Sequence, residues 1–276
     1  MQGPSSSSWL RERVEVLAQS SSSEELEAAA TELAYSDEPE AMAALGQHLR
    51  SADFLARLDD LAMPGSSMLH LSRVMRPLIE RSSPEVVALC LELAATPDFA
   101  QGPDRKSFLL EAMARVVPMQ AATVAAFRQA NDEGYFGFNA RLLADNGSPP
   151  ALDLLYDMLV DETVDLEERV ECIRVTILHR RTRIGILQMA ARLLADCADP
   201  TIVTAVIESV FDYQPQWFHL HAPMAPSWRT ASDEALRFVI ELGVKAKRQP
   251  VLSDELQEAI DATLETARRL LGSRGP

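Results

Sequence analysis

The sequence predicts an all-α fold, an α-solenoid of stacked helix pairs. Apolar residues recur with helical spacing along most of the chain. In ALDLLYDMLV (151–160), for example, Ala151, Leu154, Leu155 and Met158 share one face of a helix. No segment sustains the strict alternation of a half-buried strand. Gly accounts for 11 of 276 residues and aromatic residues for 6%, which favours helices over sandwiches and barrels.

The expected helix starts are marked by capping residues. Ser83, Ser148 and Asp199 each precede a proline. The side-chain oxygen accepts a hydrogen bond from an unpaired backbone N–H, and the missing N–H of the proline costs nothing at the first helical position. Ser22 and Glu25 have the spacing of a capping box. These positions therefore predict where several of the helices begin.

The helix starts recur with a period. Successive units begin at Ser83, near Pro118, at Ser148 and near Thr182, at intervals of 35, 30 and 34 residues. Each unit holds two helices of roughly 12 residues, too small to bury its own apolar face. Stacking neighbouring units buries that face, and a period of roughly 20–50 residues is typical of a solenoid. The period thus predicts a right-handed stack of helix pairs.

Two of these units resemble the HEAT-like α-helical repeat family. They are residues 83–117 and 148–181. In DLEERVECIRVTIL (165–178) an aspartate opens the second helix, as in a HEAT repeat, although Glu168–Val170 reverses the usual order of valine and arginine. The resemblance implies stacked helix pairs in an α-solenoid. It implies little about function, because one fold serves many functions.

The array is expected to form a single domain over residues 8–271, with frayed tails at 1–7 and 272–276. The first residues, MQGPSSSS, lack the basic and apolar regions of a signal peptide. No run approaches the roughly 18 apolar residues of a membrane span. The 3 cysteines are isolated, which suits a reducing compartment. These features predict a cytoplasmic protein that does not enter a membrane.

The net charge is −15, from 41 acidic and 26 basic residues. The excess is uneven: residues 1–60 carry 12 acids and 4 bases, and residues 148–181 carry 8 acids and 4 bases. Such a charge repels phosphate backbones, so we expect no general nucleic-acid binding. A solvated acidic surface is one interpretation, and attraction of a basic partner is the other.

Residues 213–228, YQPQWFHLHAPMAPSW, interrupt the period. The next helix start after Thr182 is Ser232, an interval of 50 residues, which predicts an insertion near 212–231. The three prolines of this stretch prevent a continuous helix. Insertions in solenoids often lie on the binding face. Aromatic and histidine side chains also combine contact area with a polar group.

We therefore predict a partner-binding surface on the insertion. Trp217 and Phe218 are expected to anchor it, and His219, His221 and Trp228 to line its exposed face. The alternative is that the aromatic side chains pack between repeats as part of the core. His219 and His221 lie on one face of an extended segment, but two ligands do not make a metal site. We predict no metal and no cofactor.

Two arginines beside the insertion complete the predicted site. Arg174 and Arg181 are seven residues apart and are expected to share a helical face, from which they can reach an acidic group. The alternative is that the basic residues at 179–183 stabilise the negative end of a helix dipole. Pairing of Arg174 with Glu171, three residues earlier, is a further alternative.

The remaining motifs favour binding over catalysis. There is no GxSxG, HExxH, Walker or GxGxxG pattern. GYFGFNAR (134–141) matches no phosphate-binding pattern, and core packing of Phe136 and Phe138 is the favoured interpretation. We predict a non-enzymatic scaffold or adaptor, such as a bacterial adaptor or assembly factor, that presents a helical groove to a protein partner. The alternative is a HEAT-like enzyme, similar to a bilin lyase or a DNA glycosylase.

Overall fold

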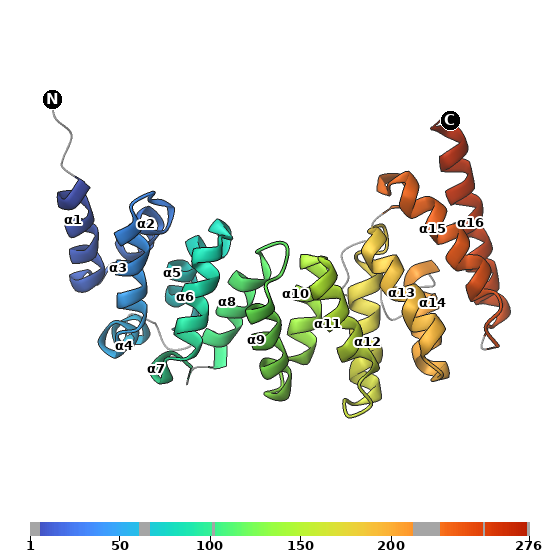
Figure 1. Cartoon of the computed structure of the whole chain (residues 1–276), viewed down its shortest axis with the longest axis horizontal. Coiled ribbons are helices and arrows are strands. Elements are labelled where there is room, and N and C mark those ends of the chain that lie inside the picture. The colour runs from blue at the N-terminus through green and yellow to red at the C-terminus, as the bar shows by residue number, and fades with distance from the viewer. Residues whose placement is uncertain (1–5, 61–66, 101–102, 212–226, 251, 275–276) are drawn as a thin grey trace. The chain divides into compact units, whose positions relative to one another are not determined.

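The computed structural model describes residues 6–60, 67–100, 103–211, 227–250 and 252–274. Every regular element in these ranges is helical, with no strand, which confirms the all-α prediction (Figure 1). None of the helices in these ranges is long and apolar enough to span a bilayer. The chain divides into two units, residues 1–129 and 130–276, with the boundary inside helix α9.

The first unit holds α1 (Ser6–Gln19), α2 (Ser23–Tyr35), α3 (Pro39–Leu49), α4 (Ala52–Asp60), α5 (Ser67–Arg81), α6 (Pro84–Ala94), α7 (Pro97–Ala100), α8 (Pro103–Ala114) and most of α9 (Ala121–Asp132). The second holds α10 (Phe136–Asn146), α11 (Pro149–Val160), α12 (Leu166–Leu178), α13 (Ile184–Asp196), α14 (Pro200–Phe211), the short 3-10 helix η2 (Trp228–Thr230), α15 (Asp233–Ala246) and α16 (Asp254–Ser273).

Several predicted helix starts are confirmed by their caps. The hydroxyls of Ser22, Ser83 and Ser232 each accept a hydrogen bond from a backbone N–H in the first turn of α2, α6 and α15. The carboxylate of Asp199 accepts from the N–H of Thr201 at 2.8 Å, at the start of α14. The start expected near Thr182 lies at Ile184, because residues 180–183 form a turn before the helix.

In the second unit the helices form two layers (Figure 1). α10, α12, α14 and α16 contact one another in turn and make one layer. α11, α13 and α15 make the other. Each helix also packs against a neighbour in sequence, such as α10 against α11 and α15 against α16. Among the described helices, this is the contact pattern of consecutive helix pairs that pack mainly against the pairs beside them.

The first unit has the same pattern with more interruptions. α2, α5 and α8 contact one another in turn, and so do α1, α3 and α6. The short helices α4 and α7 each contact one helix of either row, and they contact each other. Each unit has its own apolar core, with Phe99 and Phe127 fully buried in the first and Phe211 in the second. The prediction of one continuous array over 8–271 stays a prediction.

Arginines connect successive helix pairs within each unit. Arg57 and Arg81 donate to backbone carbonyls at the ends of α1 and α2, 39 to 47 residues earlier in the chain. Arg183 donates to the carbonyl of Asp145, at the end of α10, at 3.1 Å. Arg180 pairs with the carboxylate of Asp145 at 2.7 Å. Cations placed here satisfy carbonyls that have no partner inside the helix and oppose the negative end of its dipole.

Candidate functional site

The two predicted arginines do not share a helical face. α12 ends at Leu178, and Arg181 lies in the turn that follows, so the prediction that Arg174 and Arg181 project from one helix is wrong. Arg174 is half-buried, and its guanidinium pairs with Glu208 of α14 at 3.1 Å. This ion pair connects two helices of the same layer.

Arg181 contacts Trp228 inside the second unit. The guanidinium carbon lies 5.4 Å from the centroid of the indole ring, within the range of a cation–π contact. Arg181 is 3% exposed and Trp228 is 6% exposed. The prediction that Trp228 lines an exposed surface is therefore wrong, because the indole covers a buried guanidinium. Its N–H has no hydrogen-bond partner among the described residues.

The other members of the predicted surface lie outside the described residues. These are Trp217, His219 and His221, within 212–226. Their role in partner binding stays a prediction. At the end of the predicted insertion, Ser227 caps η2 by accepting a hydrogen bond from the N–H of Arg229 at 3.3 Å.

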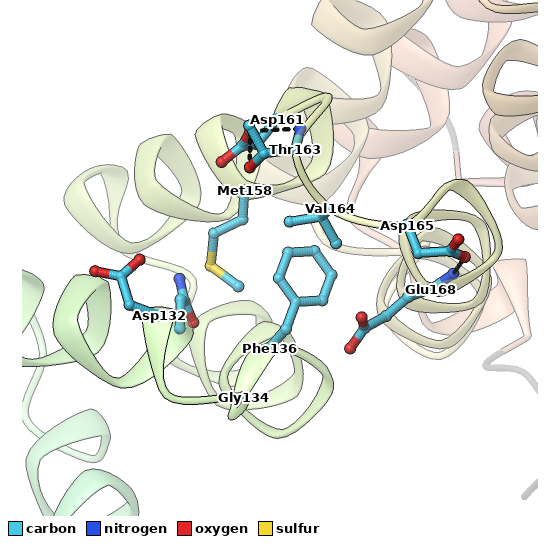
Figure 2. Close-up of a pocket in the computed structure, with 10 residues that line it drawn as sticks. Asp132, Gly134, Phe136, Met158, Asp161, Thr163, Val164, Asp165 and Glu168 are labelled. Atoms are coloured by element: carbon cyan, nitrogen blue, oxygen red, sulfur yellow. Dashed lines mark hydrogen bonds between the residues drawn. The ribbon is translucent and has the colours of Figure 1, made fainter.

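A pocket of about 320 Å³ lies elsewhere in the second unit (Figure 2). It opens between the turn that joins α9 to α10 and the turn that joins α11 to α12. Ten residues line it: Asn131, Asp132, Gly134, Phe136, Met158, Asp161, Thr163, Val164, Asp165 and Glu168. The lining contains four carboxylates and no basic side chain.

The floor of the pocket is apolar. Phe136, Met158 and Val164 point toward one another in Figure 2, and the first two are 4% and 5% exposed. The predicted packing of Phe136 is confirmed, and its ring also faces the pocket. Gly134 forms the turn that places Phe136 in the pocket. Its φ is +91°, a value that residues with a side chain rarely adopt. The N–H of Tyr135 closes this turn by donating to the carbonyl of Ala130 at 3.2 Å.

Hydrogen bonds hold two of the rim carboxylates in place. Asp161 accepts from the N–H and the hydroxyl of Thr163 at 2.9 and 2.7 Å. Asp165 caps α12 by accepting from the N–H of Glu167 at 2.8 Å. The hydroxyl of Thr163, its N–H and the nearby Arg169 together lower the pKa of Asp161, which therefore stays ionised at neutral pH.

The next turn along the layers extends this negative charge. Asp199 caps α14, and the N–H of Thr201 is the main cause of its lowered pKa. Arg169, which is 8% exposed, contributes to the lowered pKa of both Asp161 and Asp199. Arg169 belongs to α12, which packs against α14, so the buried guanidinium acts on carboxylates of both turns. We name the four rim carboxylates, together with Glu162 and Asp199, the acidic edge: Asp132, Asp161, Glu162, Asp165, Glu168 and Asp199.

The acidic edge and its pocket can bind a cation that carries an apolar stem. The carboxylates attract the charge, and the floor excludes water from the stem. Within the described ranges, no three His, Cys, Asp or Glu side chains are grouped so that they can hold a metal ion. Carboxylates around an apolar floor fit the chemistry of an organic cation.

Sequence reasoning missed the pocket. The missed pattern is a recurrence of acids in alternate turns, in NDEGY (131–135), DETVD (161–165) and DCADP (196–200). Aspartate and glutamate at these places also serve as helix caps and first-turn residues, so the pattern alone does not indicate a site. The packing of the helices brings the first two of these turns together around the pocket, and the sequence pattern alone does not show this.

No protein-family model matches this chain, and no curated protein sequence matches it. One similar solved structure is titled "Computational Design of Self-Assembling Cyclic Protein Homooligomers". It is 17% identical to this chain, with a TM-score of 0.22, over 97% of this chain and 96% of that one. At this similarity it supports no inference about fold or function.

Proposed function

We propose that the chain is a non-enzymatic scaffold, a HEAT-like α-solenoid that binds a protein partner at the acidic edge. The observation that carries the proposal is the pocket itself, an apolar floor within a rim of four carboxylates, formed by two successive turns of the array. Such a combination resembles the core and rim of a protein interface. The cytoplasmic location expected from the sequence belongs to the same proposal.

The contact pattern supports the HEAT-like part of the proposal. Alternate helices of the second unit form two layers, and arginine contacts in both units join groups 35 to 47 residues apart, close to the length of one helix pair. In such an array equivalent turns recur along one edge, so a partner meets a surface that extends over several repeats.

The charge of the edge supports a protein partner with basic residues. Exposed charges of one sign steer a partner of the opposite sign and raise the rate of encounter. The buried floor then provides the apolar contact that such encounters need in order to persist.

Site-specific photo-crosslinking in the native cell tests the proposal. A photo-reactive residue replaces Ala198, which is exposed in the α13–α14 turn and carries no charge. The matched control replaces Gln257, which is exposed on α16. We expect one defined protein to crosslink from position 198 and not from 257, and to bind the purified chain. Equal crosslinking from both positions, or none from 198, contradicts the proposal.

A further inference from the structure

We infer that the pocket receives a long basic side chain, arginine or lysine, from an extended segment of the partner that lies along the acidic edge. The inference rests on the proposed function and specifies the chemistry of the partner. It follows from the charge of the rim, the nature of the floor and the continuation of charge beyond the pocket.

The rim carboxylates have no counter-ion among the described residues. Asp132, Asp161, Asp165 and Glu168 form no ion pair with any described residue. The nearby cation, Arg169, is nine-tenths buried and influences Asp161 without pairing with it. An incoming cation therefore meets several carboxylates whose charge is not yet compensated, and it need not break an existing ion pair.

The floor selects a cation with a hydrocarbon stem. Phe136, Met158 and Val164 present apolar surface at the centre of the pocket (Figure 2). The methylene groups of arginine or lysine can cover this surface while the charged end meets the rim. The ring of Phe136 adds attraction for a cation near its face. A bare metal ion makes no use of such a floor.

The charge continues beyond the pocket in the direction of the next repeat. Glu162 is exposed beside the rim, and Asp199 caps α14, the neighbour of α12 in the same layer. A segment with several basic residues can therefore place one side chain in the pocket and others along the edge. The pocket fixes the position of one basic side chain, and the flanking carboxylates attract the other basic residues of the segment.

The probe is a fluorescein-labelled peptide of glycine and serine with an arginine at every third position. Its control carries citrulline, the uncharged analogue of arginine, at the same positions. Fluorescence anisotropy with the full chain measures both affinities. We expect the arginine peptide to bind at least about tenfold more tightly than the citrulline peptide, and this preference to shrink at high salt. Equal affinity of the two peptides contradicts the inference.

Two kinds of variant separate the pocket from the general negative charge. Asp132→Asn with Glu168→Gln removes two rim charges, and we expect affinity for the arginine peptide to fall about fivefold. The matched control, Glu241→Gln with Glu258→Gln, removes two exposed carboxylates on α15 and α16 and is expected to change affinity less than twofold. Equal effects of the two pairs show that only net charge matters and overturn the inference.

Val164→Trp fills the pocket and leaves every rim charge in place. We expect a loss of arginine-peptide affinity similar to that of the rim variant, because the stem of the guest no longer fits. Unchanged affinity shows that the pocket is not the receptor. If this variant unfolds, as judged by circular dichroism, the rim pair and its control still decide the question.

Spermine and the crosslinking result distinguish the remaining outcomes. Spermine that binds more tightly than the peptide, and loses affinity in the rim variant, identifies a free polyamine as the occupant and overturns the inference. If a partner crosslinks from position 198 but the arginine and citrulline peptides bind equally, this inference is wrong and the proposed function stands. Absence of the crosslink from position 198 contradicts the proposed function, and absence of the peptide preference as well contradicts both.

Discussion

The pocket of the acidic edge and the contact between Arg181 and Trp228 use similar ingredients in opposite ways. Both lie in the second unit, and both combine charge with an aromatic ring. In the pocket, turn and cap hydrogen bonds hold Asp161 and Asp165 at the surface above the ring of Phe136. In the other contact, the guanidinium and the indole are buried against each other. The types of residue are therefore similar in the two regions. The backbone position of each charged side chain decides whether it lies at the surface or is buried.

Truncation after Asp196 is expected to have the largest effect on stability. It removes the contact between Arg181 and Trp228 and keeps the pocket. The fragment loses Trp228 and α14 to α16 but retains every residue that lines the pocket. Since each helix pair contacts only its neighbours, we expect a folded, helical fragment whose urea m-value falls roughly in proportion to chain length. Arginine-peptide binding is expected to persist. Complete loss of helical circular dichroism contradicts the repeat architecture.

Trp228→Ala is expected to cost about 3–5 kcal/mol of unfolding free energy, because it removes a buried aromatic side chain. Urea melts measure the loss. Trp9→Ala is the control, since Trp9 is half-buried and its N–H contacts the exposed carboxylate of Glu32; we expect a smaller cost there. Arginine-peptide affinity is expected to remain unchanged in Trp228→Ala. A cost below about 1 kcal/mol indicates that the indole is not part of the core.

A double-mutant cycle measures the contact between Arg181 and Trp228 directly. Arg181→Met and Trp228→Phe, singly and together, are expected to show a coupling free energy of about 0.5–2 kcal/mol. The physical reason is that a guanidinium shielded from water is attracted more strongly to an aromatic face. Urea melts of the four proteins provide the measurement. If the effects of the two substitutions on the unfolding free energy are additive, the contact between Arg181 and Trp228 does not contribute to stability.

Asp165 separates the capping role of a rim carboxylate from its charge. Asp165→Asn is expected to change the unfolding free energy by less than about 0.5 kcal/mol, because asparagine caps a helix as well as aspartate does. Asp165→Ala is expected to cost about 1 kcal/mol through loss of the cap. Both substitutions are expected to weaken the arginine peptide to a similar degree. Stronger binding by Asp165→Asn than by Asp165→Ala would mean that the cap, rather than the charge, supports the pocket.

The smallest expected effect is that of mild acid. Asp161 and Asp199 have pKa values below the ordinary one, so their contribution to stability is complete above the unfolded pKa of about 3.9 and is lost as pH falls through the lower folded values. Neither stability nor arginine-peptide binding is expected to change through these groups between pH 7 and pH 5. Loss of peptide binding within that window points to a histidine and contradicts the carboxylate assignment.

Much of the helical layout was predictable because it depends on local chemistry. The caps at Ser83 and Asp199 lie where the sequence places them, since a hydroxyl or carboxylate needs only the next turn of backbone to find its partner. The helix expected to start near Thr182 starts at Ile184, because a turn over residues 180–183 precedes it. The motif HRRTR has no residue pattern that predicts this turn. The exposure of Trp228 was also predicted wrongly, because burial depends on residues far away in the chain.

The sequence by itself determined which segments are helical and roughly where they begin, because apolar periodicity and capping act over one or two turns. Tertiary structure alone decided that Arg181 packs on Trp228, 47 residues later, and that Asp132 and Glu168, 36 residues apart, line one pocket. Those pairs meet because the helices of the second unit fold back on one another. The packing angle between helix pairs sets which side chains become neighbours there, and no local pattern encodes that angle.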